Sequence, residues 1–310
     1  MLFDRNRLTI KKLDERKSKT SYNPMRIIPE IEDTKQLAFA NELAGEIKKK
    51  KKVIIGFGAH FIKNKCHRHL VQLMYINQYV THVITNGAST IHDFEFGYHG
   101  KTEENVRENL ANGTFGLWET GEHVNRAINT YTELGYGTAM GRYIDEERDK
   151  SHIWPAGCVS LAWHCYKRDI PLSICTSVGH DIIYEHPECD GAKIGEASYI
   201  DFLKLAHTME GIKDAVFICV GSAITVPMVV EKAFAMAKNV ASDTGDNCSC
   251  YVVDLFADDG EWADGEPPMD NLSYYNRPMK TFNRMFPGRC KYMQLDNRQL
   301  MYHLRNELCE

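Results

Sequence analysis

The segment Pro171-Leu172-Ser173-Ile174-Cys175-Thr176-Ser177-Val178-Gly179-His180-Asp181 changes character half-way along its length. Its first half is a short apolar run after a proline, which is typical of a buried strand. Its second half begins a loop, Thr176–Asp190, that is crowded with Ser, His, Asp and Glu. Because α/β proteins bind ligands where strands end at the carboxyl edge of a sheet, the segment predicts a ligand site, and its acidic residues favour a cationic ligand. The alternative is a solvated loop after an ordinary strand.

The same change from an apolar run to small residues occurs at three other places. Val53–His60, Thr81–Ser89 and Ala215–Ala223 each have the pattern of a strand followed by a turn of glycine or other small residues. Helical patterns alternate with these strands, and such alternation predicts a parallel sheet with helices on both faces. We therefore expect an α/β protein with a Rossmann-like, doubly wound, mostly parallel sheet.

The remaining elements follow from hydrophobic periodicity. Further strands are expected at 249–255 and 292–295, and helices at 37–50, 65–79, 119–148, 155–168, 198–210, 226–240 and 297–308. Residues 1–36 are polar and rich in Lys, Arg and Asp, which predicts an N-terminal arm outside the fold. Residues 37–310 are expected to form a single domain, for which a hydrophobic content of 43% is sufficient.

Composition excludes several classes of protein. A net charge of −5 argues against a nucleic-acid-binding protein. A run of about 18 apolar residues, as a membrane span needs, is absent from the sequence, and Met1–Arg5 lacks the apolar region of a signal peptide. Most of the ten cysteines lie in apolar runs, which indicates free thiols and a cytoplasmic location. The close pair Cys248-x-Cys250 has no second pair at zinc spacing, so no metal site is expected.

Turns of small residues between a strand and a helix are suited to binding phosphates. The backbone can approach the anion closely there, and the first N–H groups of the helix point at it. The turns at 56–59, 86–89 and 221–223 therefore predict a nucleotide site. Each turn alone is weak evidence, since Gly56-Phe57-Gly58 lacks the third glycine of the dinucleotide fingerprint. The alternative for each is a tight turn without a ligand.

These motifs occur together, in this order, in one known family. Over roughly residues 37–308 the chain resembles deoxyhypusine synthase, and specifically the shorter deoxyhypusine synthase-like branch of prokaryotes. The resemblance is carried by Thr85–Asp93, Pro171–Asp181, Gly221-Ser222-Ala223 and Cys189–Ser198. It implies a Rossmann-like fold, bound NAD, and a homotetramer with active sites at subunit interfaces.

The resemblance also implies a reaction. Enzymes of the family remove a hydride from a carbon beside an amine nitrogen, attach the fragment to a lysine as an imine, and pass it to an acceptor amine. The matching lysine is Lys280, in Tyr274-Tyr275-Asn276-Arg277-Pro278-Met279-Lys280. It must be neutral when it attacks, and an apolar, aromatic wall together with the charge of Arg277 is expected to favour that form. Without the resemblance, Lys280 would be interpreted as a surface lysine.

A set of expected site residues follows. Catalytic roles are expected for Lys280, His92 and His180, because an imidazole titrates near working pH, although each histidine could serve only as a hydrogen-bonding residue. The expected cofactor-binding residues are Gly58, Ala59, Thr85, Asn86, Gly87, Ala88, Gly221, Ser222, Ala223 and Asp254. The carboxylates expected to bind a cationic amine are those of Asp93, Asp181, Glu185 and Asp258.

Two departures from the family lie near the expected substrate. Deoxyhypusine synthases carry paired histidines where this chain has Ala223–Pro227, and a tryptophan where it has Pro278. We therefore expect an NAD-dependent transferase that moves an aminobutyl or guanidinobutyl group between small amines such as agmatine, putrescine or spermidine, in polyamine biosynthesis of the spermidine or homospermidine type. The alternatives are deoxyhypusine formation on a translation-factor lysine and a non-catalytic protein that senses NAD and polyamines.

Overall fold

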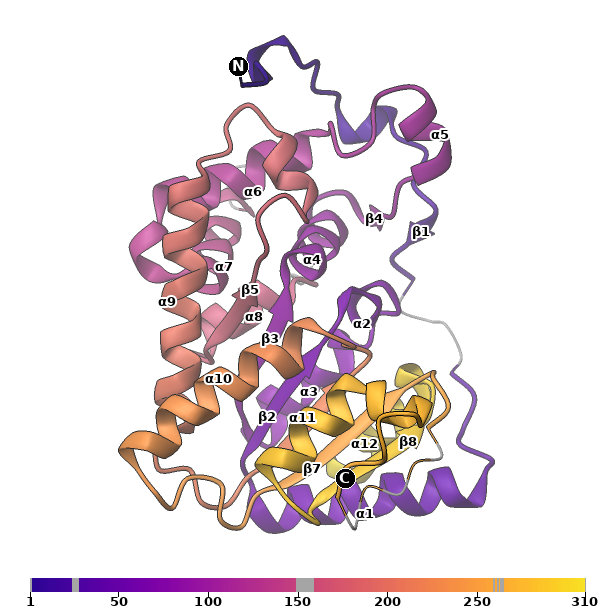
Figure 1. Cartoon of the computed structure of the whole chain (residues 1–310). Coiled ribbons are helices and arrows are strands. Elements are labelled where there is room, and N and C mark those ends of the chain that lie inside the picture. The colour runs from indigo at the N-terminus through magenta and orange to yellow at the C-terminus, as the bar shows by residue number, and fades with distance from the viewer. Residues whose placement is uncertain are drawn as a thin grey trace. The chain divides into compact units, whose positions relative to one another are not determined.

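The computed structural model describes residues 2–23, 28–148, 159–258, 260, 262 and 265–309. The chain divides into two compact units (Figure 1). Unit 1 comprises Met1–Met25 and Gly87–Asp201, and unit 2 comprises Arg26–Asn86 and Phe202–Glu310. Residues 37–310, which were expected as one domain, therefore contribute to both units.

Unit 2 is built on parallel strands in the order β3-β2-β6-β7-β8. These strands are β2 (Val53–Phe57), β3 (Val80–Asn86), β6 (Val216–Val220), β7 (Ser249–Asp254) and β8 (Cys290–Gln294). Every residue of β2 and β6 is buried, as expected of central strands covered on both faces. The strands predicted for this part of the chain are all confirmed.

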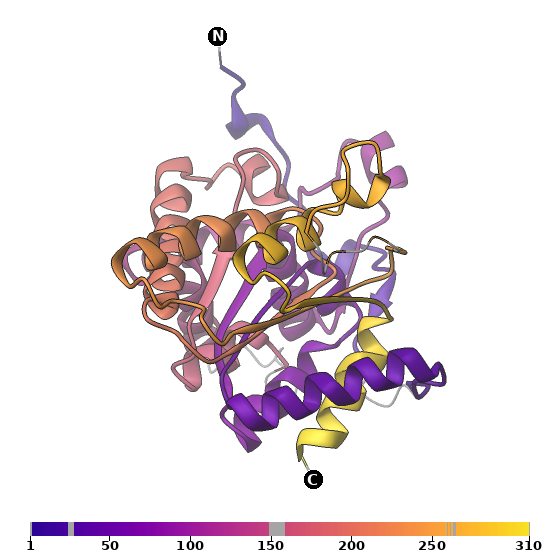
Figure 2. The same cartoon turned by 60° about the horizontal axis from the view of Figure 1, so that its bottom comes forward.

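Helices cover both faces of this sheet. They are α1 (Thr34–Lys50), α2 (Ala59–Lys63), α3 (His67–Ile76), α10 (Thr225–Val240), α11 (Arg277–Met285) and α12 (Asn297–Cys309). Helix α12 packs against α1 and α3, and α10 packs against α11. Figure 2 shows α1 and α12 on one side of the strands and α10 and α11 on the other. The predicted α/β class, Rossmann-like with a parallel sheet and helices on both faces, is confirmed.

Helix α1 illustrates how the sequence specifies these elements. The Asp33 carboxylate caps the helix by accepting the N–H groups of Lys35 and Gln36. Leu43 and Ile47 recur at helical spacing and are buried, so one face of the helix packs into the core of unit 2. The lysine run lies at the C-terminal end of the helix, where positive charge suits the helix dipole.

Unit 1 is mainly helical. Its helices are α4 (Gly87–His99), α5 (Val106–Ala111), α6 (Glu119–Thr130), α7 (Tyr136–Arg148), α8 (Leu161–Lys167) and α9 (Gly191–Met209), of which α9 spans the boundary in the sequence; its strands are β1 (Thr20–Ser21), β4 (Lys101–Thr102) and β5 (Leu172–Cys175). The helix expected at 119–148 is divided near Gly135, which has a φ of 79°. The helix expected at 155–168 is α8, and residues 151–158 lie outside the described part of the chain.

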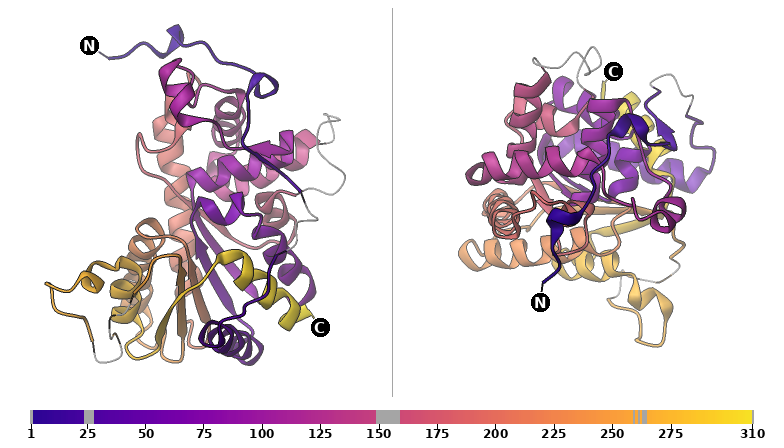
Figure 3. Two further views of the ribbon diagram at one scale, coloured as in Figure 1. Left: turned by 90° about the vertical axis from the view of Figure 1, so that its right-hand side faces the viewer. Right: turned by 90° about the horizontal axis from the view of Figure 1, so that it is seen from above.

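Residues 2–23, expected as an arm, pack on unit 1 in an extended course (Figure 3), and we call them the strap. Leu13 of the strap is fully buried, and Lys11 forms a parallel bridge to Trp118. Strand β1 pairs antiparallel with β4. Although the strap is polar in composition, Leu13 and the bridge at Lys11 therefore anchor it to unit 1. Among the described residues, no helix is both long and apolar enough to cross a membrane.

Candidate functional site

Two glycine turns of unit 2 touch at the carboxyl ends of β2 and β6. The N–H of Gly58 donates to the carbonyl of Val220 at 3.2 Å, and a Cβ on Gly58 would collide with the carbonyl oxygen of Gly221. Gly221 has a φ of +56° and open space around its Cα, so its backbone conformation, and not steric crowding, favours glycine. From β2 the chain continues to β3 on one side, and from β6 to β7 on the other. The two turns therefore lie at the switch point of the sheet, where open α/β sheets bind ligands.

The turn after β6 leads into the N-terminus of α10. The hydroxyl of Ser222 accepts the N–H of Val226 at 3.2 Å, which holds the turn against the helix, while Gly221 and Ala223 are exposed. An exposed turn before a helix of this length suits a phosphate, because the helix dipole favours an anion there. On the other side of the switch point, Ala59 begins α2 and is half-buried.

Two expected cofactor residues lie at the end of β3. The hydroxyl of Thr85 is buried and donates to the carbonyl of Phe57 at 2.9 Å, so it ties β3 to β2. Asn86 is the last residue of β3 and is half-buried. The contact of Thr85 is structural, which leaves the turns at Gly58 and Gly221 as the better phosphate site in unit 2.

A pocket of about 570 Å³ opens beside the Gly221 turn. Its lining comes from the turn after β6, the end of β7 and the loop that follows it, the 3-10 helix Leu272–Tyr275, the start of α11 and one residue of β8. The residues that line it are Ala223, Ile224, Asp254, Phe256, Ala257, Asp258, Leu272, Ser273, Tyr275, Asn276, Arg277, Pro278 and Tyr292. Apolar and aromatic walls with a few polar groups are typical of a small-molecule site.

Asp254 and Asp258 supply the carboxylates of this pocket. Asp254 Oδ1 accepts the N–H of Leu255 at 2.7 Å, which shapes the turn after β7. Asp258 accepts the N–H of Gly260 at 2.9 Å and further hydrogen bonds from the side chains of Asn276 and Trp262, so it organises its loop. Within the described ranges, neither carboxylate forms an ion pair with a Lys, Arg or His side chain. Both can therefore meet a cationic ligand without breaking an existing pair.

Lys280 lies on helix α11, in its first turn and a half. The side chain of Asn276 caps this helix by accepting the N–H of Met279. The Nζ atom of Lys280 lies 3.2 Å from the centroid of the Tyr274 ring, and Lys280 does not line the 570 Å³ pocket. A hydrogen bond from Arg284, with the charge of Lys280 in addition, lowers the pKa of Glu266. Lys280 thus comes shortly after the lining residues Arg277 and Pro278 in the sequence, and its side chain faces Tyr274.

In unit 1, Asp181 faces the N-terminus of helix α4. Its exposed fraction is 7%, its carboxylate accepts the N–H of Ala88, and a Cβ on Gly87 would collide with it. Burial raises the pKa of Asp181 to about 6, against the opposing effects of the His180 charge and the Ala88 hydrogen bond. A carboxylate thus occupies the turn where the sequence predicted a phosphate. We revise that prediction: Gly87 and Ala88 accommodate Asp181 and are left out of the proposed cofactor site.

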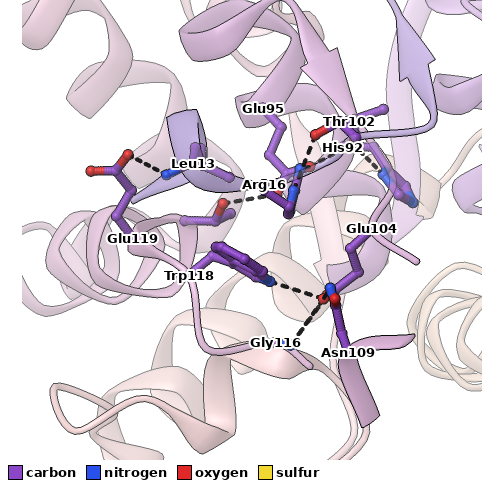
Figure 4. Close-up of polar contacts among 12 residues, drawn as sticks. Leu13, Arg16, His92, Glu95, Thr102, Glu104, Asn109, Gly116, Trp118 and Glu119 are labelled. Atoms are coloured by element: carbon purple, nitrogen blue, oxygen red, sulfur yellow. Dashed lines mark hydrogen bonds and ion pairs between the residues drawn. The ribbon is translucent and has the colours of Figure 1, made fainter. Parts of the chain in front are cut away.

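His92 belongs to a buried hydrogen-bond network of unit 1 (Figure 4). Thr102 Oγ1 donates to Glu95 at 2.6 Å, so its interaction with His92 Nδ1 at 2.7 Å requires the imidazole to donate. Arg16 of the strap binds both oxygens of Glu95 at 2.7 Å, and Thr120 donates to the same carboxylate. Burial alone would raise the pKa of Glu95, but the hydrogen bonds and charge of Arg16 lower it. The network therefore sets the tautomer of His92 and holds the strap.

Asp93, the neighbour of His92, has a structural role that the sequence did not predict. Its carboxylate is buried and accepts hydrogen bonds from Ser160 Oγ at 2.6 Å and from the N–H groups of Leu161 and Ala162 at 2.7 and 3.0 Å. These contacts cap helix α8. We therefore revise the expectation that Asp93 binds an amine, because its oxygens are used by the helix.

The other loop residues of unit 1 differ in exposure. His180 is exposed, and Glu185 is half-buried on the loop after β5. Burial, with the nearby charge of Glu104, raises the pKa of Glu185. Glu104 itself accepts hydrogen bonds from Trp118 Nε1 at 2.9 Å and from the N–H of Gly116 (Figure 4). Glu185 thus remains a candidate for binding a cationic amine in unit 1, whereas its neighbour Glu104 has a structural role.

The expected site residues divide between the units. Unit 2 contains Gly58, Ala59, Thr85, Asn86, Gly221, Ser222, Ala223, Asp254, Asp258 and Lys280, and unit 1 contains Gly87, Ala88, His92, Asp93, His180, Asp181 and Glu185. Sequence reasoning missed the wall residues Phe256, Tyr275 and Tyr292, and considered Arg277 only for its effect on Lys280. The wall side chains come from separate elements, so only the pairing of β7 with β8 brings Tyr292 to the pocket. No group of three or more His, Cys, Asp or Glu side chains suited to a metal ion occurs in the described part of the chain.

Comparison with known proteins gives the fold. No protein-family model matches the chain, and no curated protein matches it. Among solved structures, unliganded AgrE matches 91% of the chain with a TM-score of 0.53 at 14% identity, and the complex of AgrE with ornithine and NAD+ matches 91% with a TM-score of 0.51 at 14% identity. The chain spans 34% of the AgrE chain in both.

Two further structures extend over a larger share of their own chains. A candidate LOR/SDH protein from Methanococcus maripaludis S2 matches 94% of this chain and 73% of its own, with a TM-score of 0.50 and 14% identity. A candidate deoxyhypusine synthase from Entamoeba histolytica matches 89% of both chains, with a TM-score of 0.49 and 9% identity. At these identities, the likeness to AgrE and to the Methanococcus protein establishes a shared fold.

Proposed function

We propose that this protein is an NAD-dependent transferase that moves an alkylamine group to an amine acceptor through a lysine imine. The observation that carries the proposal is the 570 Å³ pocket of unit 2, which places two carboxylates beside the Gly221 turn. The turn suits an anionic dinucleotide, and the carboxylates suit a cationic amine. One site of unit 2 is therefore complementary in charge to the dinucleotide and to the amine.

The residues present fit a dinucleotide. The exposed Gly221 has open space around its Cα, and Ser222 and Ala223 lead into the N-terminus of α10. Asp254, expected among the cofactor-binding residues, lines the pocket together with Asp258, and we assign its carboxylate to the amine. AgrE, which has a similar fold, has been solved with ornithine and NAD+. NAD bound here would take up a hydride from the amine substrate and later return it.

The chain's own side chains would hold the amine. The carboxylates of Asp254 and Asp258 would pair with ammonium or guanidinium groups. The faces of Phe256, Tyr275 and Tyr292 would cover the alkyl chain and interact with the cationic ends. Together these groups would orient the substrate carbon and exclude water from it.

Lys280 would supply the covalent step. Once the amine carbon has lost its hydride and the nitrogen a proton, the neutral Nζ atom of Lys280 adds to the imine carbon and the original amine leaves. The acceptor amine then displaces Nζ from the same carbon, and return of the hydride gives the alkylated product. Lys280 lies three residues after the lining residue Arg277 on α11 and so shares its face of the helix. The step requires the Lys280 side chain to leave the Tyr274 ring and turn toward the pocket.

A second function is favoured by one contact. The Nζ atom of Lys280 faces the Tyr274 ring and does not line the pocket. This arrangement supports a protein that binds NAD and an amine without turnover, as a sensor of both.

Trapping the lysine adduct separates the two functions. The pure protein is incubated with NAD and agmatine, putrescine or spermidine, NADH absorbance is followed, and borohydride is added before mass spectrometry. Transient NADH and an adduct on Lys280 support the transferase, and Lys280→Ala should lose the adduct and the transferred product while it retains NAD binding. Lys232→Ala on helix α10 is the control, since this exposed lysine lies outside the pocket. Binding of NAD and amine without NADH or an adduct would identify the sensor.

A further inference from the structure

We propose that the pocket of unit 2 accepts an amine that also carries a carboxylate, namely an amino acid with a cationic side chain, in preference to a plain polyamine. This inference rests on the proposed function, because it names the substrate class of the same pocket. It follows from a guanidinium group that a site for polyamines alone would not need.

Arg277 is that group. It is the first residue of helix α11 and it lines the pocket together with Asp254 and Asp258. Its side chain is exposed, and no carboxylate of the described residues forms an ion pair with it. By contrast, Arg284 on the same helix pairs with Glu266. Among the described residues, Arg277 is therefore without an ion-pair partner, whereas Arg284 has one.

The pocket thus presents both signs of charge. The carboxylates of Asp254 and Asp258 attract a cation, and a guanidinium is the side chain best suited to bind a carboxylate through two parallel hydrogen bonds. A polyamine brings only positive charges, so it gains from the aspartates and is repelled by Arg277. An amino acid with a cationic side chain can satisfy both kinds of group at once. The apolar walls formed by Ile224 and Phe256 suit the methylene chain between its charged ends.

The dinucleotide phosphate is the other anion that Arg277 could meet. The lining of the pocket includes Ala223, which belongs to the proposed phosphate turn. Arg277, however, comes from a different element, and the aspartates line the same pocket. We therefore assign Arg277 to the amine substrate and make the phosphate an outcome of the test.

Two matched ligand pairs test the assignment. Ornithine differs from putrescine by one carboxylate, and arginine differs from agmatine in the same way. Their affinities are measured by calorimetry on the full chain with NAD present, for the natural protein, for Arg277→Gln and for the control Arg284→Gln. Because putrescine carries the larger net positive charge, cation binding by the aspartates alone would make it at least as good a ligand as ornithine.

We expect the natural protein and Arg284→Gln to bind ornithine and arginine about tenfold more tightly than putrescine and agmatine, as a charge-assisted pair allows. Arg277→Gln should remove this preference and leave NAD affinity unchanged. Equal binding of both members of a pair, or a preference that survives in Arg277→Gln, overturns this inference alone. A loss of NAD affinity in Arg277→Gln with the amine preference intact assigns Arg277 to the phosphate and also overturns it. Binding of NAD with none of the four amines overturns the amine-binding function itself.

Discussion

Asp181 and Asp254 are both carboxylates near the carboxyl end of a strand, but the structure uses them differently. Asp181 is 7% exposed and faces the first turn of α4, whereas Asp254 is half-buried and lines a pocket. The burial of Asp181 favours its neutral form and raises its pKa to about 6. This difference makes Asp181 a determinant of stability and leaves Asp254 available to a ligand.

The variant Asp181→Asn tests this role through pH. The folded pKa of about 6 lies above the ordinary value of 3.8, so the folded state binds the proton more tightly, and stability is lost as the pH rises from about 4 to about 6. Asn is nearly isosteric, keeps an acceptor for Ala88 and carries no charge. At pH 7.5 we expect its free energy of unfolding to exceed that of the natural protein by up to about 3 kcal/mol, and at pH 4 the two should agree.

Urea unfolding of both proteins at several pH values provides the measurement. A variant that is less stable than the natural protein at pH 7.5 would contradict the proposed burial of an isolated charge. A tenfold loss of amine affinity at unchanged stability would instead return Asp181 to the substrate site, as the sequence predicted.

At the scale of elements, the strap is held by one buried ion pair. The side chains of Arg16 and Glu95 are almost completely buried and joined by two hydrogen bonds of 2.7 Å. Glu95 is further bound by Thr102 and Thr120. Removing one member of such a pair leaves the other charge buried without compensation. The strap is therefore part of the folded core of unit 1.

We expect Arg16→Ala to lower the free energy of unfolding by about 3–5 kcal/mol at neutral pH. The double variant Arg16→Met, Glu95→Gln removes both charges and keeps an acceptor for Thr102 and Thr120, so it should recover most of that loss. Chemical denaturation measures the loss in Arg16→Ala, and the same measurement on Arg16→Met, on Glu95→Gln and on their double variant gives the coupling energy. A double variant as unstable as Arg16→Ala would show that packing, and not charge, holds the strap.

The contact between the turns at Gly58 and Gly221 leads to a second prediction at the scale of elements. In Gly58→Ala the new methyl group would meet the carbonyl of Gly221, so the turns after β2 and β6 must separate. We expect this variant to lose NAD affinity. Gly221→Ala has room for its methyl group but a φ of +56°, which costs about 1–2 kcal/mol of stability. Calorimetry with NAD on both variants checks this, and full NAD affinity in folded Gly58→Ala would contradict a site at these turns.

At the scale of the whole molecule, the proposed cofactor and amine sites both belong to unit 2. Ligand binding slows amide exchange where it stabilises the backbone locally. With NAD present, we expect slower hydrogen exchange at residues 56–60, 220–226 and 254–258, measured by mass spectrometry. Slower exchange confined to 87–92 would contradict this and support the α4 turn, which the sequence also predicted. A sample of the same protein without NAD is the control.

The local elements could be read from the sequence. Val53–Phe57 and Val216–Val220 are apolar runs that end in small residues, and the alternation of such runs with helical patterns is sufficient for a parallel sheet. The glycines at 58 and 221 and the carboxylates at 254 and 258 could also be identified as candidates, because residue type and position after a strand are local properties. Lys280 came only from the resemblance, since nothing in its neighbours marks a nucleophile.

Contacts between distant residues were decided by the tertiary structure. Arg16 and Glu95 are 79 residues apart, and nothing in the polar composition of residues 1–36 indicates a buried pair. In the same way, no pattern places the Asp181 carboxylate against Gly87, or brings Arg277 into a pocket with Asp254. Periodicity reports the environment of a side chain along its own element, whereas the partner of a charge depends on how loops close and how elements pack. The sequence by itself therefore determined the class of fold and the residue types of the site, and the packing of each unit decided which charges are already paired and which can meet a ligand.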